Sequence, residues 1–231
     1  METEPRADVV GSRYFVYIAV AFVLILTISD TIASKLIQVG PFVLSAAVVL
    51  FPVSYIFGDI LTEVYGYRAS RKIIWSGFVA LIVMSVVYYL GQILPPASFW
   101  TSQAAYETIL GAVPRIVFAG IVAYFFGEFS NSYVMSKMKI WTEGRHLWTR
   151  TIGSTVVGEG VDTIFFYTVA FIGTISSSEL LTVIGSAYLF KVAYEVIATP
   201  ITYAVVGWLK RTEGVDVYDR GVNYNPFALS E

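Results

Sequence analysis

The sequence contains no cysteine and a single histidine, and each shortage excludes a class of site. Without cysteine the chain has no disulfide, no thiolate metal site and no cysteine nucleophile. The only histidine, His146, lies in a basic loop, so a zinc site is not expected and no cofactor is predicted. The chain also lacks a Gly-x-x-x-x-Gly-Lys phosphate loop, so it does not hydrolyse ATP itself. The net charge of −2 gives no reason to expect a nucleic-acid partner.

Charged residues are scarce as well, and apolar residues occur in long runs. Only 14% of the 231 residues are charged and 56% are hydrophobic, whereas a soluble domain carries about 25% charged residues. A helix that crosses a bilayer needs about 20 largely apolar residues. Clusters of Pro, Gly and Ser separate six such runs. We therefore predict an all-α membrane protein with six transmembrane helices: Tyr14–Leu36, Phe42–Val64, Ile73–Leu94, Val113–Met135, Thr151–Ile172 and Ile184–Leu209.

The basic residues are concentrated in alternate loops. Twelve of the fifteen Lys and Arg residues flank the spans on one side, and the connections 92–110 and 173–183 contain none. Because basic loops stay in the cytosol, both termini are predicted to be cytoplasmic in a multi-pass protein of the inner cell membrane. The predicted parts are a cytosolic tail (1–12), a six-helix transport domain (13–210) and a second cytosolic tail (211–231).

Two carboxylates, Glu159 and Asp162, lie near the middle of the predicted fifth span. A carboxylate at the bilayer centre costs about 2.5–3.5 kcal/mol, and the three-residue spacing places both groups on one helical face. They are expected to face a protein interior or a water-filled cavity. A binding or transport site is the first interpretation, and a structural pair that clamps helices together is the alternative.

Further ionisable residues lie in the predicted spans. Lys191 is about two turns into the sixth span, and Glu195, four residues on, could pair with it along one face. Lys35 and Arg115 lie near outer span ends, where a cation can reach the interface. So many charged groups are expected to converge on an interior. The full set has seven acids and three bases: Asp30, Asp59, Glu63, Glu128, Glu159, Asp162, Glu195, Lys35, Arg115 and Lys191.

Prolines and small residues indicate how the helices pack. Pro52 and Pro200 are predicted to interrupt the second and sixth spans, either as packing kinks or as breaks that expose backbone groups to a substrate. Small residues at four-residue spacing let helix backbones approach closely. This closeness is either within one subunit or between two, so a homodimer is an open possibility. The small residues are Ala119, Ala123 and Gly127 in the fourth span and Ser154 and Gly158 in the fifth.

Five stretches carry the pattern of a known family. They are FPVSYIFGDILTEVYGYRASRKIIW (51–75), GEFSNSYVMSKMK (127–139), RTIGSTVVGEGVDTIFFYTVAF (150–171), KVAYEVIATPITY (191–203) and DVYDRGVNYNPF (216–227). The chain resembles the queuosine precursor transporter family, also grouped as vitamin uptake transporters, and the Gly-Glu-Gly-x-Asp-Thr segment is the most specific part of the resemblance. It implies six helices, a fold similar to the substrate-binding components of energy-coupling-factor transporters, and import of 7-deazapurines such as preQ0 or preQ1.

The resemblance also implies roles for individual residues. Glu128 and Glu159 stand where some relatives carry an uncharged amide. An Ala-x-x-x-Ala docking motif, typical of the first helix of energy-coupling-factor substrate components, is missing, which weakens the expectation of an energising partner. The family's recurrent polar positions fall on Asp59, Arg115, Asp162, Thr163 and Lys191.

The chemistry of the residues agrees with such a substrate. A deazaguanine presents a ring N–H beside an exocyclic amine, and one carboxylate can accept both donors in charge-assisted hydrogen bonds. Asp162 or Glu159 is the expected acceptor, and Phe166 or a neighbouring tyrosine is expected to stack on the flat ring. Lys191 and Arg115 would balance the negative charge of the empty site.

Three functions compete at this point. The leading hypothesis is a secondary or facilitative importer, not an enzyme, that takes a small planar nucleobase-like substrate across the lipid bilayer. The second is a substrate-binding component that needs an ATP-driven partner. The third is an intramembrane hydrolase that uses Glu159 and Asp162 as acid and base. The predicted substrate-binding residues are Asp162, Glu159, Arg115, Lys191, Glu195, Glu128, Thr163, Phe166, Asp59 and Asp30.

Overall fold

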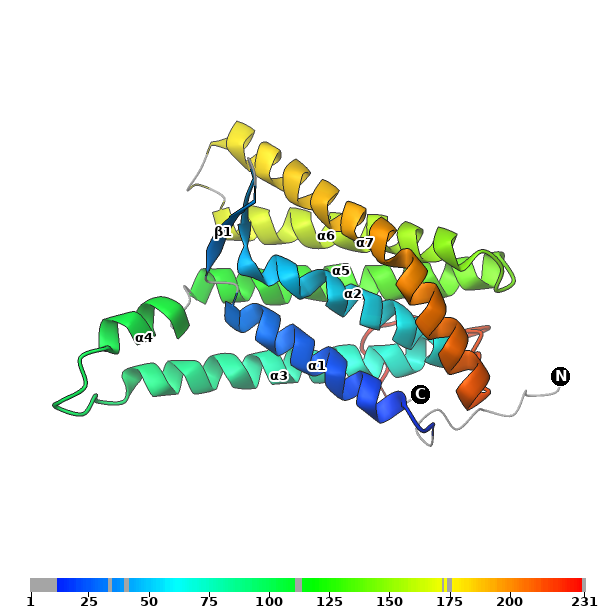
Figure 1. Cartoon of the computed structure of the whole chain (residues 1–231), viewed down its shortest axis with the longest axis horizontal. Coiled ribbons are helices and arrows are strands. Elements are labelled where there is room, and N and C mark those ends of the chain that lie inside the picture. The colour runs from blue at the N-terminus through cyan, green and yellow to red at the C-terminus, as the bar shows by residue number, and fades with distance from the viewer. Residues whose placement is uncertain are drawn as a thin grey trace.

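The computed structural model describes residues 12–32, 35–39, 42–110, 114–171, 173 and 176–229. Long helices lie roughly side by side in a bundle, and a short β-hairpin stands near one end of it (Figure 1). The helices are α1 (Phe15–Ile32), α2 (Phe51–Ile60), α3 (Tyr67–Ile93), α4 (Gln103–Leu110), α5 (Pro114–Trp141), α6 (Leu147–Phe171) and α7 (Ser177–Glu213). The hairpin consists of β1 (Leu36–Val39) and β2 (Phe42–Ser45), a 3-10 helix covers Ala46–Val49, and a π-helix covers Leu61–Tyr65.

Three of the helices, α1, α3 and α7, are long and apolar enough to cross a membrane. Helices α5 and α6 have the length of a span, with 28 and 25 residues, but they bury several charged side chains. Between residues 79 and 90 of α3 most outward-facing side chains are apolar, among them Val79, Val83, Val86 and Leu90. Such a surface suits contact with lipid tails, so the helical character of a membrane protein is confirmed for the described part of the chain.

The second predicted span begins too early. Phe42–Ser45 is a strand paired antiparallel with Leu36–Val39, and the helix starts only at Phe51. Pro52 lies in the first turn of α2, where its missing N–H leaves no helical hydrogen bond unmade. The predicted interruption at Pro52 is therefore wrong. Pro200 does lie inside a helix, α7.

Helices α5 and α6 pack together over much of their length. A Cβ atom at Gly127 would lie 2.6 Å from the Cβ of Asp162, and one at Gly158 would lie 2.6 Å from the Cβ of Asn131. Only glycine fits these two positions. The small-residue stripes thus serve packing within one chain, and they hold Asp162 directly against α5.

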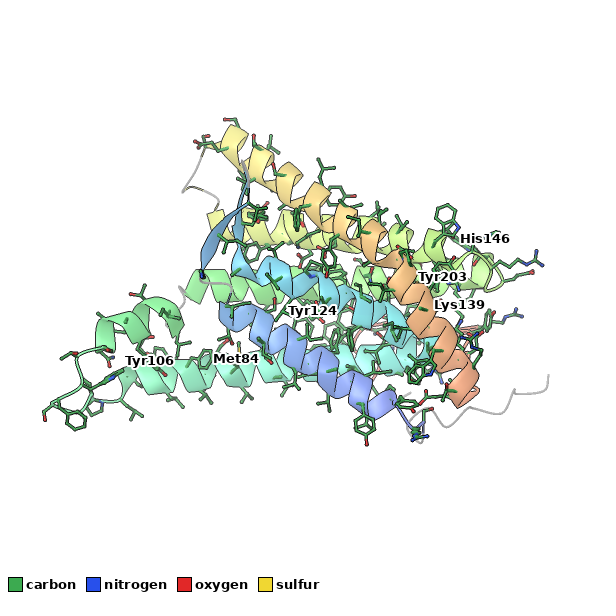
Figure 2. All side chains as sticks on the ribbon, in the orientation of Figure 1. Met84, Tyr106, Tyr124, Lys139, His146 and Tyr203 are labelled. Carbon is green, nitrogen blue, oxygen red and sulfur yellow. The ribbon has the colours of Figure 1, made fainter. Side chains whose placement is uncertain are left out.

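One end of the bundle carries both the start of α1 and the end of α7, where the backbone N–H of Tyr14 donates to Glu213 at 2.5 Å. We call it the terminal end, and the opposite end the hairpin end. The turn from α5 to α6, with the exposed His146, also lies at the terminal end (Figure 2).

A buried ionic cluster occupies the terminal end. The Glu63 carboxylate accepts hydrogen bonds from both Nε and Nη2 of Arg150, each at 2.6 Å, and from Nζ of Lys210 at 2.5 Å. Lys139 lies 3.7 Å from the same carboxylate and 2.5 Å from Asp216. Although burial alone raises the pKa of Asp216, its hydrogen bonds to Lys139 and Lys210 lower that pKa below its ordinary value. Glu63 therefore belongs to a structural cluster, and the prediction that all the ionisable groups converge on one interior is wrong.

The C-terminal segment, 214–229, packs across the terminal end. Arg71 is fully buried and donates to two backbone carbonyls of this segment, each at 2.8 Å. Trp75 donates to a third carbonyl at 2.8 Å. Asp219 accepts from the backbone N–H of Tyr67, at the first turn of α3, at 2.9 Å. A carboxylate at that position satisfies a free helix N–H and complements the helix dipole.

Candidate functional site

A cavity of about 130 Å³ lies toward the hairpin end of the bundle. Its wall is formed by α1, α3, α5, α6 and α7, with β2, the 3-10 helix and the start of α2 beside them. Tyr124, which lies near the middle of the bundle, is part of this wall (Figure 2). Most lining residues are apolar, and a few polar groups converge among them, which is typical of a small-molecule site. The polar lining residues are Ser29, Asp30, Tyr124, Asp162, Tyr167 and Lys191.

A three-membered ion pair lies at the cavity wall. The ammonium group of Lys191 is 2.7 Å from a carboxylate oxygen of Asp162 and 2.7 Å from one of Glu159. The two acids lie one turn apart on α6, so one face of that helix presents both to α7. The Lys191 side chain is 15% exposed and the Glu159 side chain 1%. Charges so well shielded from water attract each other strongly, but each depends on its partner for stability.

Lys191, which the sequence analysis paired with Glu195, instead forms its ion pairs with residues of the neighbouring helix α6. Lys191 projects from α7 toward α6, while Glu195, one turn further along α7, is 2% exposed. An i,i+4 spacing permits a pair on one helix, but a carboxylate pair across the helix interface binds the ammonium group from two sides.

Nine of the ten predicted site residues fall into three groups. Four line the cavity: Asp30, Asp162, Phe166 and Lys191. Glu159 is buried beside them and bound to Lys191. The other group is buried away from the cavity lining, on four different helices: Asp59, Glu128, Thr163 and Glu195. Arg115 belongs to α5, but its side chain lies outside the described residues.

Asp59 has polar neighbours of its own. One of its carboxylate oxygens accepts a hydrogen bond from the side-chain amide of Asn131 at 2.7 Å and one from Ser154 at 3.4 Å. All three side chains are fully buried, and they join α2, α5 and α6. The arrangement favours a role for Asp59 in holding these helices together beneath the cavity.

The aromatic residues that follow Asp162 lie in two different environments. Phe166 lines the cavity, and Tyr167 beside it packs edge-on against its ring, with centroids 5.2 Å apart. Phe165 instead stacks on Phe126 at 4.6 Å, and both rings are partly exposed on the outer face. Phe165 is therefore not part of the cavity wall.

Sequence reasoning missed several residues of the cavity wall. Tyr124 precedes Glu128 by four residues and so shares its helical face, a signal that points to the interior. Ser29 and Phe190 have no such signal, because apolar and hydroxyl residues are common everywhere in membrane helices. Among the described residues, no group of three or more His, Asp or Glu side chains is arranged to hold a metal ion.

Similarity to known proteins identifies the family. The family model described as "Putative vitamin uptake transporter" matches residues 45–205, well over half of the chain. The chain belongs to this family of vitamin uptake transporters. It is 36% identical over 157 residues to the "Probable queuosine precursor transporter" of Bacillus subtilis (strain 168), covering 68% of this chain and 69% of that protein.

A second vitamin uptake transporter is more distant. The chain is 22% identical over 159 residues to the "Queuosine precursor transporter" of Escherichia coli (strain K12), covering 67% of each protein. No solved structure matches. The matched part of the chain includes Glu159, Asp162 and Lys191, whereas Ser29 and Asp30 of the cavity wall precede it. Membership places the chain among membrane transporters, which is consistent with a function that is not enzymatic.

Proposed function

We propose that this vitamin uptake transporter imports a queuosine precursor, a 7-deazapurine of the preQ0 or preQ1 type, and that the cavity at the hairpin end is its binding site. The observation that carries the proposal is the Asp162 carboxylate on the wall of an otherwise mostly apolar cavity. A deazaguanine ring offers two adjacent N–H donors, and a carboxylate can accept both.

Asp162 is the better candidate for the recognition carboxylate, because it lines the cavity and Glu159 lies behind it. Lys191 contacts Asp162 at 2.7 Å and limits the movement of its carboxylate. Glu159 shares the ammonium group and keeps it in place when the substrate engages Asp162. The flat ring lies against Phe166 and Tyr167, whose faces and edges provide apolar contact. The proposal keeps the charge-balancing role expected for Arg115, whose side chain lies outside the described residues.

The protein lies in the inner membrane with six crossings: α1, α2 with its π-helix, α3, α5, α6 and α7. The terminal end faces the cytosol and the hairpin end faces outward. Support comes from the basic residues, because the cluster around Arg150 and Lys210 lies at the terminal end. With this orientation the cavity lies in the outer half of the protein, where an importer meets its substrate first.

The orientation is tested with reporter fusions. Fusions at Gln103 and Ser177 are expected to report an external position, and fusions at Glu143 and at the C-terminus an internal one, since basic loops remain in the cytosol. Some reporters are active only outside the cytosol. Activity of such a reporter fused to the C-terminus would contradict the orientation and, with it, the direction of transport.

Asp162→Asn tests the recognition carboxylate. The substitution keeps the shape of the side chain but replaces one acceptor oxygen by a donor and removes the charge. A hydrogen bond to a charged group contributes about 1.5–3 kcal/mol, so affinity for preQ0 or preQ1 is expected to fall roughly ten- to a hundredfold. Isothermal titration calorimetry on the purified protein in detergent measures this change.

The matched control for this experiment is Glu143→Gln, which makes the same chemical change on a side chain that is 74% exposed. It should bind like the wild type. Lys191 keeps Glu159 as a partner in Asp162→Asn, so we expect the variant to fold. Unchanged affinity in a well-folded Asp162→Asn variant would leave Asp162 with a structural role only.

A further inference from the structure

The interior of the transporter holds more acids than bases. Of the cationic side chains that the structure describes, Lys191 alone lies among the carboxylates between the cavity and the Glu63 cluster. An unpaired buried carboxylate costs several kcal/mol when it is ionised, and such a group takes up a proton instead. Acids in this region that lack a cation partner among the described residues are therefore candidates for proton uptake. The described carboxylates in this region are Asp30, Asp59, Glu128, Glu159, Asp162 and Glu195.

Among these acids, Glu128 has the fewest contacts that would offset the free-energy cost of burying a carboxylate. Its side chain is fully buried, and within the described part of the chain neither of its oxygens has a hydrogen-bond partner. The carboxyl group fits against α2 only because residue 58 is glycine, since a Cβ there would overlap with Oε1. The fold thus leaves space for this carboxyl group, although no ion pair with a described residue offsets the cost of its burial.

The neighbours of Glu128 link it to the binding site. Nearly all of them are acids or phenols, so an ionised Glu128 would be repelled by the same carboxylates that surround Lys191. The groups that act on it electrostatically come from α2, from its own helix and from α6: Tyr55, Asp59, Tyr124, Glu159 and Asp162.

A stripe of hydroxyl groups leads from Glu128 toward the terminal end. Ser132 and Ser136 follow it at four-residue spacing on α5, and both are buried. Ser132 lies 3.1 Å from the hydroxyl of Thr62 and 3.3 Å from that of Ser70. Ser136 donates to Asp219 at 2.6 Å. Hydroxyl groups both donate and accept hydrogen bonds, so this stripe places groups that can bind water along the terminal half of α5.

We propose that Glu128 carries a proton in each transport cycle, which makes the protein a proton–substrate symporter. This inference rests on the proposed function. A proton from the external water forms an O–H bond with the Glu128 carboxylate while the cavity is open outward, and the substrate binds in the cavity at Asp162. After the protein opens to the cytosol, the substrate leaves and the same O–H bond breaks, releasing the proton to water along the hydroxyl stripe. One substrate and one proton enter together, and the substrate is chemically unchanged.

The test uses purified protein alone in proteoliposomes, with radiolabelled preQ1 and preQ0 as probes. Wild type is expected to accumulate the label several-fold above its external concentration when the lumen is more alkaline than the medium, and a protonophore should abolish this. Glu128→Gln cannot ionise. Because Glu128 does not line the cavity, that variant should still exchange external label for unlabelled substrate inside, but it should not accumulate label. The control variant Glu143→Gln should both exchange and accumulate the label.

The outcomes separate this inference from the proposed function. Absence of exchange in the wild type with both probes would refute the proposed function and the inference with it. Normal exchange by the wild type, with accumulation that does not depend on the proton gradient, would refute proton coupling but not the proposed function. Full accumulation of label by the Glu128→Gln variant would do the same. If the Glu128→Gln variant fails to fold, a pH-sensitive dye in the lumen of vesicles with wild-type protein tests the coupling instead. Addition of substrate outside should acidify the lumen. A constant luminal pH would refute the proposal.

Discussion

Replacing Lys191 with methionine is expected to weaken substrate binding at neutral pH by roughly ten- to a hundredfold. The ammonium group lies 2.7 Å from both Asp162 and Glu159, so its removal leaves two buried carboxylates without their shared cation. Breaking such a pair costs about 3–5 kcal/mol unless an acid takes up a proton. Glu159 and Asp162 then compete for that proton, and a protonated carboxyl group at Asp162 cannot accept two hydrogen bonds from the substrate.

The pH dependence of binding is the decisive measurement for Lys191→Met. Recognition of the two donors needs the Asp162 carboxylate, so affinity in the variant should rise with increasing pH more steeply than in the wild type. Lys72→Met, which removes an exposed cation from α3, is the control and should match the wild type. Equal affinity and identical pH profiles for Lys191→Met and wild type would mean that Lys191 does not balance the site.

Glu63→Gln is expected to lower the free energy of unfolding by about 3–5 kcal/mol. The carboxylate is fully buried and receives two hydrogen bonds from Arg150 and one from Lys210, while Lys139 lies close by. The neutral amide would leave three mutually repelling cations at the terminal end. Thermal or denaturant unfolding of the purified protein in detergent measures the loss.

An exposed ion pair provides the comparison for Glu63. Glu143 and Arg145 lie 3.8 Å apart, with side chains that are 74% and 76% exposed. Because solvent screens such a pair, its loss in Glu143→Gln should change stability by less than about 1 kcal/mol. Similar stability losses for the two variants would show that the Glu63 cluster contributes no more than a surface pair.

The predicted and observed spans show where sequence patterns are ambiguous. The run 36–50 is apolar enough to extend two membrane helices, but it forms a hairpin and a 3-10 helix. Short apolar runs suit a strand as well as a helix, and periodicity does not separate the two. Likewise, the C-terminal residues are polar and read as a tail, although Arg71 and Trp75 bind their backbone carbonyls. Backbone acceptors carry no sequence signal.

The sequence by itself determined that Glu159 and Asp162 share a face and lie in an interior. Helical periodicity sets the first property, and the cost of a carboxylate in lipid sets the second. Only the tertiary structure decided that Lys191 binds both of them, that Asp162 lines the cavity, and that Glu63 belongs to a separate cluster. The physical reason is that these pairings depend on the rotation and depth of each helix against its neighbours. The close contacts at Gly127 and Gly158 set that register between α5 and α6, and no spacing within one helix specifies it.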